Sequence, residues 1–102
     1  MLIVAGVFQV DPDRRDEFIR GRAPAMEASR AEPGCLEYVF APDPIVPGRV
    51  VLLERWTDEA SLADHIAALR LARKDAAPSA DEVPVLSSEI LKYEVGAVAP
   101  LG

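Results

Sequence analysis

The chain has 102 residues, of which half are hydrophobic and 27% are charged, and its formal net charge is −6 at pH 7. This length suits one hydrophobic core, so we expect a single domain over residues 1–102, with a core at about 2–95 and a tail at 96–102. The acidic balance argues against a nucleic-acid surface. The single cysteine, Cys35, excludes an intrachain disulfide and a cysteine metal cluster.

Membrane insertion and export are not expected from the amino-acid pattern. No apolar run approaches the length of about 20 residues that a spanning helix needs. The first residues read as a strand and carry none of the regions of a signal peptide. We therefore expect a cytoplasmic protein without a membrane partner.

The first half of the chain reads as strand, helix and strand. Residues 2–10 are apolar on both alternating faces, which predicts a strand buried on both sides. Asp11 and Pro12 predict the start of a helix, and Pro24 predicts a kink in it. Pro33 and Gly34 end that helix, and the next strand is expected at about 35–41, with Leu36, Tyr38 and Phe40 on one side.

The second half repeats the order strand, helix, strand. Residues 42–48 hold three prolines and predict a loop, followed by a strand at 49–56. Thr57 and Asp58 supply a cap for a helix at about 59–74, in which Leu62, Ile66 and Leu69 form the apolar stripe. His65 falls at the margin of that stripe. A loop is expected at 77–84, and a last strand at about 88–95.

The order β-α-β-β-α-β is that of an α+β, ferredoxin-like fold, an antiparallel sheet with both helices on one face. Because the first and third strands are apolar on both sides, the second face of the sheet needs a cover. The simplest cover is the same face of another copy, so we expect a homodimer.

The sequence resembles the antibiotic biosynthesis monooxygenase family. The most specific segments are EPGC at 32–35 and E-R-W-x-D-E-A-x-L-x-x-H from Glu54 to His65. The opening MLIVAGVFQV, then DPDRRDEF and the terminal YEV, extend the likeness over residues 2–95. The resemblance implies a dimeric α+β barrel and an oxidation of phenols or hydroquinones by O2 without metal, flavin or haem.

The sequence departs from its relatives after the first histidine. Many relatives carry a second histidine in an S-P-H-F-like segment, whereas residues 68–74 here read ALRLARK. Haem-degrading relatives use a histidine in this region and an asparagine on the first strand. Because the first strand has no asparagine and His65 is the single histidine, haem degradation is not expected.

The predicted site follows from the demands of oxygenation without a cofactor. The substrate must supply the electrons, and the protein supplies a proton acceptor and a dry, orienting pocket. We expect His65 to be the acceptor, since the imidazole titrates near neutrality. The predicted substrate-binding residues are the aromatic and apolar side chains Trp56, Tyr38, Phe40, Phe8, Leu62, Ile66, Leu69 and Tyr93.

Structural roles remain open for the same residues. His65 can be a packed side chain at a helix edge, and Trp56 can be core and pocket wall at once. Glu37 and Glu54 interrupt apolar sets, and we interpret them as strand-edge or interfacial salt bridges rather than as buried carboxylates. The functional alternatives are a small-molecule-binding or stress-related dimer without catalysis, or an isomerase or lyase acting on an enolisable carbonyl compound.

Overall fold

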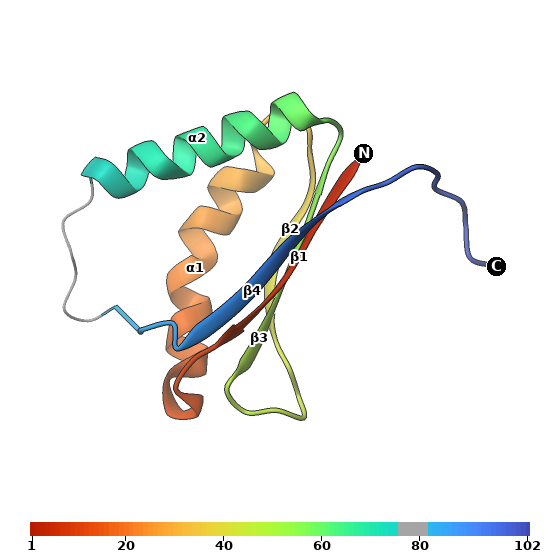
Figure 1. The fold of residues 1–102 in the computed structure, drawn as a ribbon. Coiled ribbons are helices and arrows are strands. Elements are labelled where there is room, and N and C mark those ends of the chain that lie inside the picture. Colours follow the sequence, from red (N-terminus) through yellow and green to blue (C-terminus); the bar gives the residue numbers. More distant parts are fainter. Residues whose placement is uncertain (76–81) are drawn as a thin grey trace.

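The computed structural model describes residues 1–75 and 82–102. Its elements in chain order are β1 (Leu2–Gln9), the 3-10 turn η1 (Pro12–Arg14), α1 (Arg15–Arg30), β2 (Cys35–Pro42), β3 (Arg49–Trp56), α2 (Glu59–Asp75) and β4 (Ser87–Glu94). The strands form one antiparallel sheet in the order β2-β3-β1-β4, and both helices lie on one face of it (Figure 1). This confirms the α+β, ferredoxin-like fold, and each strand lies within one residue of its expected bounds.

Alternate residues of the strands point towards the helices. In the β1–β3 pair, Leu2 lies opposite Trp56 and Val4 opposite Glu54, so these side chains share one face of the sheet. The hydrophobic core between this face and the helices consists of Leu2, Val4, Val10, Phe18, Tyr38, Phe40, Val50, Leu52, Trp56, Leu62 and Val83.

Both predicted helix starts carry side-chain caps. The Asp11 carboxylate accepts the backbone N–H of Asp13 at 2.9 Å and opens η1, which leads directly into α1. The Asp58 carboxylate accepts the N–H of Ser61 at 2.8 Å at the start of α2. α1 continues through Pro24 as one helix to Arg30.

Two details of the expected burial are wrong. A register shift between Cys35 and Glu37 inserts an extra residue into β2, and Leu36, expected on the side of Tyr38, is 48% exposed. In α2, the expected stripe member Ile66 is 39% exposed, whereas His65 is 2% exposed. The helix therefore turns Leu62 and His65 towards the sheet.

None of the described helices lies over the second face of the sheet. Ile3, Ala5 and Val7 of β1 are half-buried there, and their partners on β4 include Leu91 and Tyr93, which are exposed. Among the described residues no helix is long and apolar enough to cross a membrane. The loop expected at 77–84 lies mostly outside the described residues.

Candidate functional site

The imidazole of His65 is enclosed between α2 and the sheet. Its ring centroid lies 4.7 Å from that of Trp56 at the end of β3 and 5.3 Å from that of Tyr38 on β2. All three side chains are buried, with His65 2% exposed. The structure thus brings together the predicted proton acceptor and two of the predicted aromatic walls.

Each ring nitrogen of His65 faces a carboxylate. Nδ1 lies 2.8 Å from Oε1 of Glu32, within hydrogen-bond distance. Nε2 lies 3.8 Å from Oε1 of Glu54, which is too long for a hydrogen bond. Nε2 is buried and has no hydrogen-bond partner among the described residues.

Glu54 is a buried carboxylate, not the strand-edge or interfacial salt bridge expected from the sequence. It is 6% exposed and accepts the indole N–H of Trp56 at 3.0 Å. Burial raises the pKa of Glu54 above its ordinary value, while the Trp56 hydrogen bond and the nearby His65 act in the opposite direction. Glu37 does form the expected salt bridge, with Arg55 at 3.3 Å.

Tyr38 contributes a neutral phenol to the same cluster. Burial, with the nearby Glu54 charge, raises the pKa of Tyr38 to about 12, and a hydrogen bond with the buried Ser29 offsets part of this rise. The guanidinium of Arg30 donates to the Tyr38 carbonyl at 2.9 Å and ties β2 to the end of α1.

A tight turn after α1 carries Glu32 to His65. The N–H of Glu32 donates to the Ser29 carbonyl at 3.0 Å, and the N–H of Thr57 donates to the Gly34 carbonyl at 2.9 Å. Gly34 has a φ of +82°, which favours glycine. The turn is therefore attached both to α1 and to the segment that precedes α2, so backbone hydrogen bonds hold Glu32 close to the helix that carries His65.

The other predicted site residues divide between the two faces of the sheet. Phe8 and Phe40 form an aromatic cluster with Phe18, with centroids 5.5–6.2 Å apart, on the helix side. Leu62 is buried in the same hydrophobic core, and Leu69 is half-buried. Ile66 is largely exposed, and Tyr93 pairs with Ile3 on the opposite face, so neither lies with His65.

Sequence reasoning misses Glu32 as a site residue. The EPGC segment marks the resemblance, but nothing within it gives its acidic residue a role, because the contact with His65 spans 33 positions of the chain. The sequence feature that could indicate Glu32 is an acidic residue beside a glycine turn that directly precedes a strand.

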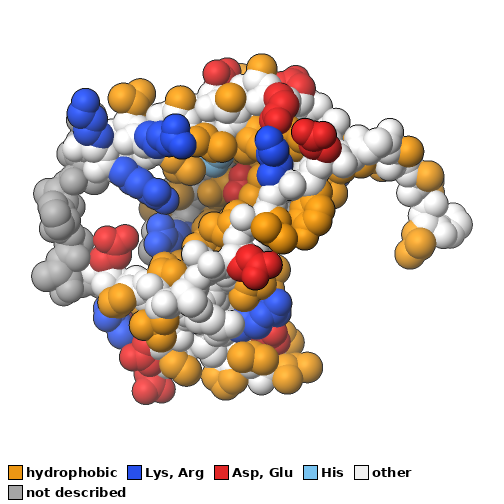
Figure 2. Space-filling model, in the orientation of Figure 1, with side chains coloured by type: hydrophobic (Ala, Val, Ile, Leu, Met, Phe, Trp, Pro, Cys, Tyr) orange, Lys and Arg blue, Asp and Glu red, His pale blue; other side chains and the backbone are white. Residues whose placement is uncertain are grey.

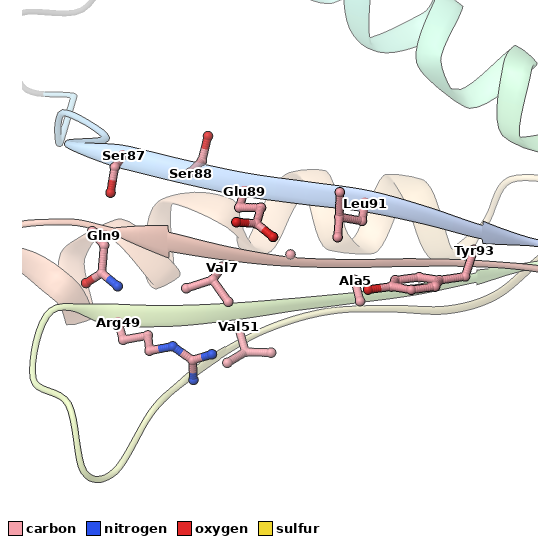
Figure 3. Close-up of a pocket in the computed structure, with 11 residues that line it drawn as sticks. Ala5, Val7, Gln9, Arg49, Val51, Ser87, Ser88, Glu89, Leu91 and Tyr93 are labelled. Atoms are coloured by element: carbon pink, nitrogen blue, oxygen red, sulfur yellow. The ribbon is translucent and has the colours of Figure 1, made fainter.

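Two hollows among the described residues lie away from His65. The larger, about 620 Å³, lies on the open face of the sheet among side chains of β1, β3 and β4, including Gln9, Arg49, Ser87, Leu91 and Tyr93 (Figure 3). The smaller, about 170 Å³, is lined by Glu17, Phe18, Gly21, Arg22, Glu82 and Val83. Figure 2 shows the molecule hollowed beneath α2, with Lys and Arg side chains around the depression. The larger hollow is a feature of the uncovered sheet, so we place the candidate site at the buried cluster.

The geometry of the cluster suits proton transfer better than metal binding. Over residues 1–75 and 82–102, no group of three or more His, Cys, Asp or Glu side chains is placed to hold a metal ion. An imidazole between two carboxylates can accept a proton and be stabilised as a cation. Aromatic rings around it supply an environment from which water is excluded.

The comparisons with known proteins agree with this fold. The family described as antibiotic biosynthesis monooxygenase matches residues 1–69. The uncharacterised protein sll1783 of Synechocystis is 38% identical over 64 residues, which are 63% of this chain and 44% of that protein. YcnE of Bacillus subtilis, named a "putative monooxygenase", is 31% identical over 65 residues, which are 64% of this chain and 68% of that protein. The chain therefore spans less than half of sll1783.

Solved structures show the same architecture at low sequence identity. PA3566 from Pseudomonas aeruginosa is 23% identical, with a TM-score of 0.71 over 94% of each chain. The haem degrader MhuD from Mycobacterium tuberculosis is 13% identical, with a TM-score of 0.73 over 98% of this chain and 100% of MhuD. At these identities the likeness establishes the fold and not the activity.

Proposed function

The chain belongs to the antibiotic biosynthesis monooxygenase family, and we propose that it is a cofactor-independent monooxygenase of a small phenolic, hydroquinone or polyketide-like aromatic substrate. The observation that carries the proposal is the buried imidazole of His65, whose Nε2 has no hydrogen-bond partner among the described residues. A proton acceptor in an aromatic, water-excluding setting is the group this chemistry requires.

The reaction needs no external reductant if the substrate supplies all the electrons. His65 Nε2 accepts the phenolic or benzylic proton, and the resulting electron-rich anion reacts with O2. Where the oxidised carbon bears two hydrogens, one oxygen atom becomes the carbonyl of the product. The other oxygen leaves as water with the two hydrogens, and the imidazole returns its proton to the leaving oxygen.

Substrate access requires side chains to move. His65 is 2% exposed and its Nε2 is buried, so a ligand oxygen reaches Nε2 only after neighbouring side chains move. Tyr38 and Trp56 would then form the pocket wall, with Phe40, Phe8, Leu62 and Leu69 behind them. Ile66 and Tyr93 take part only if binding involves the rim of α2 or a second subunit.

Haem degradation is not part of this proposal. His65 is the single histidine of the chain, and its Nδ1 lies 2.8 Å from the Glu32 carboxylate. The likeness to MhuD is one of fold, and the asparagine that haem degraders carry on the first strand is missing from β1.

We further propose that two copies pair through the open face of the sheet. Ile3, Ala5 and Val7 of β1 and Leu91 and Tyr93 of β4 form an apolar surface there without a helix over it. Burial of such a surface favours association, and a two-fold axis lets each face cover the other. The cytoplasmic location expected from the sequence stays a prediction.

One observation favours a second function. His65 lines neither of the two hollows described above, which is what a packed, structural histidine would show. In that case the chain would be a small-molecule-binding dimer without catalysis.

Oxygen uptake distinguishes the two functions. Wild type, His65→Gln and the control Leu71→Ala, which changes a side chain of α2 that is 63% exposed, are assayed against a panel of hydroquinones and anthrone-like phenols. We expect uptake with wild type and Leu71→Ala and a loss of about a hundredfold or more with His65→Gln, the usual size of a general-base contribution. Equal rates for wild type and His65→Gln would remove His65 from the mechanism. Ligand binding without uptake would support the binding function.

A further inference from the structure

The Nε2 atom of His65 needs an explanation. It is buried, it has no hydrogen-bond partner among the described residues, and Glu54 Oε1 is 3.8 Å away. Buried polar atoms are almost always hydrogen-bonded, because an unpaired one costs about 1–3 kcal/mol. Nε2 can therefore accept a proton or a hydrogen bond from a group that reaches the cluster.

Glu32 determines which nitrogen of the ring carries the proton. An ionised carboxylate can only accept a hydrogen bond, so the 2.8 Å contact with Glu32 Oε1 requires a proton on Nδ1. In the neutral ring Nε2 then carries the lone pair. The contact is held in place by the turn that Gly34 and Thr57 join to the start of α2.

Glu54 is the group that faces this lone pair. Trp56 donates its indole N–H to Oε1 of Glu54, the same oxygen that lies nearest to His65 Nε2. Two acceptors at this distance repel each other unless a proton or an O–H donor lies between them. A phenolic hydroxyl or a proton taken from a substrate carbon meets that requirement.

We propose that Glu32 and Glu54 are positioning residues for His65: Glu32 holds the Nδ1–H tautomer, and Glu54 stabilises the imidazolium formed when Nε2 takes a proton. The transfer of a substrate proton to Nε2 rests on the proposed function. The Nδ1–H tautomer and the stabilisation of the imidazolium by Glu54 do not depend on that function. The titratable groups that face the ring are Glu32 from the α1–β2 turn, Glu54 from β3 and Tyr38 from β2, and Arg22 of α1 acts on Tyr38.

The single histidine of the chain makes a direct test possible. Two-bond proton–nitrogen NMR correlation of 15N-labelled protein reports which ring nitrogen is protonated, and it needs no substrate. We expect a protonated Nδ1 and an unprotonated Nε2 above the titration midpoint of the ring. An Nε2–H tautomer in the wild-type protein would overturn the proposal without any variant having to fold.

Two isosteric variants separate the two carboxylates. In Glu54→Gln the amide oxygen can still accept the indole N–H of Trp56 while the negative charge beside Nε2 is lost, so the ring should take up its second proton about one pH unit lower than in the wild type, a tenfold loss of proton affinity. In Glu32→Gln the preference for Nδ1–H should weaken and the two tautomers should mix. The control Glu37→Gln removes a carboxylate that pairs with Arg55, and it should leave the ring unchanged. An unchanged titration in Glu54→Gln would exclude the role assigned to Glu54.

Kinetics then link the pair to catalysis. With a substrate from the oxygen-uptake panel, Glu54→Gln should lower kcat by about tenfold, matching the lost proton affinity, with KM nearly unchanged. The NMR result stands if no substrate is oxidised, in which case the proposed function fails and the tautomer assignment survives. An Nε2–H tautomer with normal oxidation would instead exclude the role assigned to Glu32 and the role of Nε2 as proton acceptor, while the oxidation of the substrate itself would stand.

Discussion

Trp56 donates its indole N–H to the Glu54 carboxylate at 3.0 Å, across two positions of the same strand. Because residues two apart on a strand share a face, both side chains enter the core together. The indole is fully buried and satisfies one acceptor of a carboxylate that would otherwise be costly to bury. This pair places a polar group at the centre of an apolar core and aims it at His65.

Replacing Trp56 with Phe should destabilise the protein. The change removes the hydrogen bond to Glu54, worth about 1–3 kcal/mol, and leaves a cavity where part of the indole was, so a total loss of about 3 kcal/mol is expected. Urea unfolding followed by far-ultraviolet circular dichroism measures the change. The control Ile45→Ala removes an apolar side chain that is 85% exposed and should change stability by less than about 0.5 kcal/mol. Equal changes in the free energy of unfolding for Trp56→Phe and Ile45→Ala would contradict a stabilising contact between Trp56 and Glu54.

Glu54 should make the folded state sensitive to pH. Burial raises the pKa of Glu54 above 4.5, so at pH values between 4.5 and the raised value the folded state binds more protons than the unfolded state. Stability therefore falls as the pH rises through this window, by linkage. In Glu54→Gln this part of the dependence should disappear. Urea midpoints of both proteins from pH 4 to 8 test it, and parallel curves would show that Glu54 does not titrate differently on folding.

Gly34 should be intolerant of a side chain. Its φ is +82°, and an added Cβ would run into Ser61 and lie 2.7 Å from Thr57 Oγ1. Gly34→Ala should therefore cost at least about 1–2 kcal/mol from the backbone conformation alone. It should also move Glu32 away from His65, which the NMR signal of the ring would report.

Gly21→Ala is the matched control for Gly34→Ala. Gly21 lies within α1, and an added Cβ there meets nothing within 4 Å. Alanine favours the helix, so this variant should gain up to about 1 kcal/mol. A loss of stability in Gly21→Ala, or none in Gly34→Ala, would contradict the assignment of the turn.

The sequence predicted most of the fold because local signals and tertiary structure agree. Alternating apolar residues mark the four strands, and Asp11 and Asp58 occupy the helix starts where they were expected. The position of Leu36 could not be predicted, since the extra residue in β2 is visible only in the pairing with β3.

The site was predictable only in part. Strand alternation already placed Glu54 on the side of Leu52 and Trp56, yet a carboxylate on an apolar side could not be interpreted without its partners. Those partners come from α2 and from the turn after α1, which are distant in the chain. Helical periodicity left His65 at the margin of a stripe, and only the packing of α2 shows that His65 is buried while Ile66 is exposed.

Leu91 tests the proposed pairing through the open face. Its side chain shares that face with Ala5, its partner on β1, and it is 46% exposed in the single chain. We expect a dimer for the wild type in sedimentation at micromolar concentration. In Leu91→Lys each of the two copies would bury a lysine charge in the interface. A cost of about 3 kcal/mol for this burial would raise the Kd of the dimer by about a hundredfold. Ile90→Lys is the control, because Ile90 is next in sequence and 47% exposed but points to the helix side. A monomeric wild type, or equal dissociation of both variants, would exclude this interface.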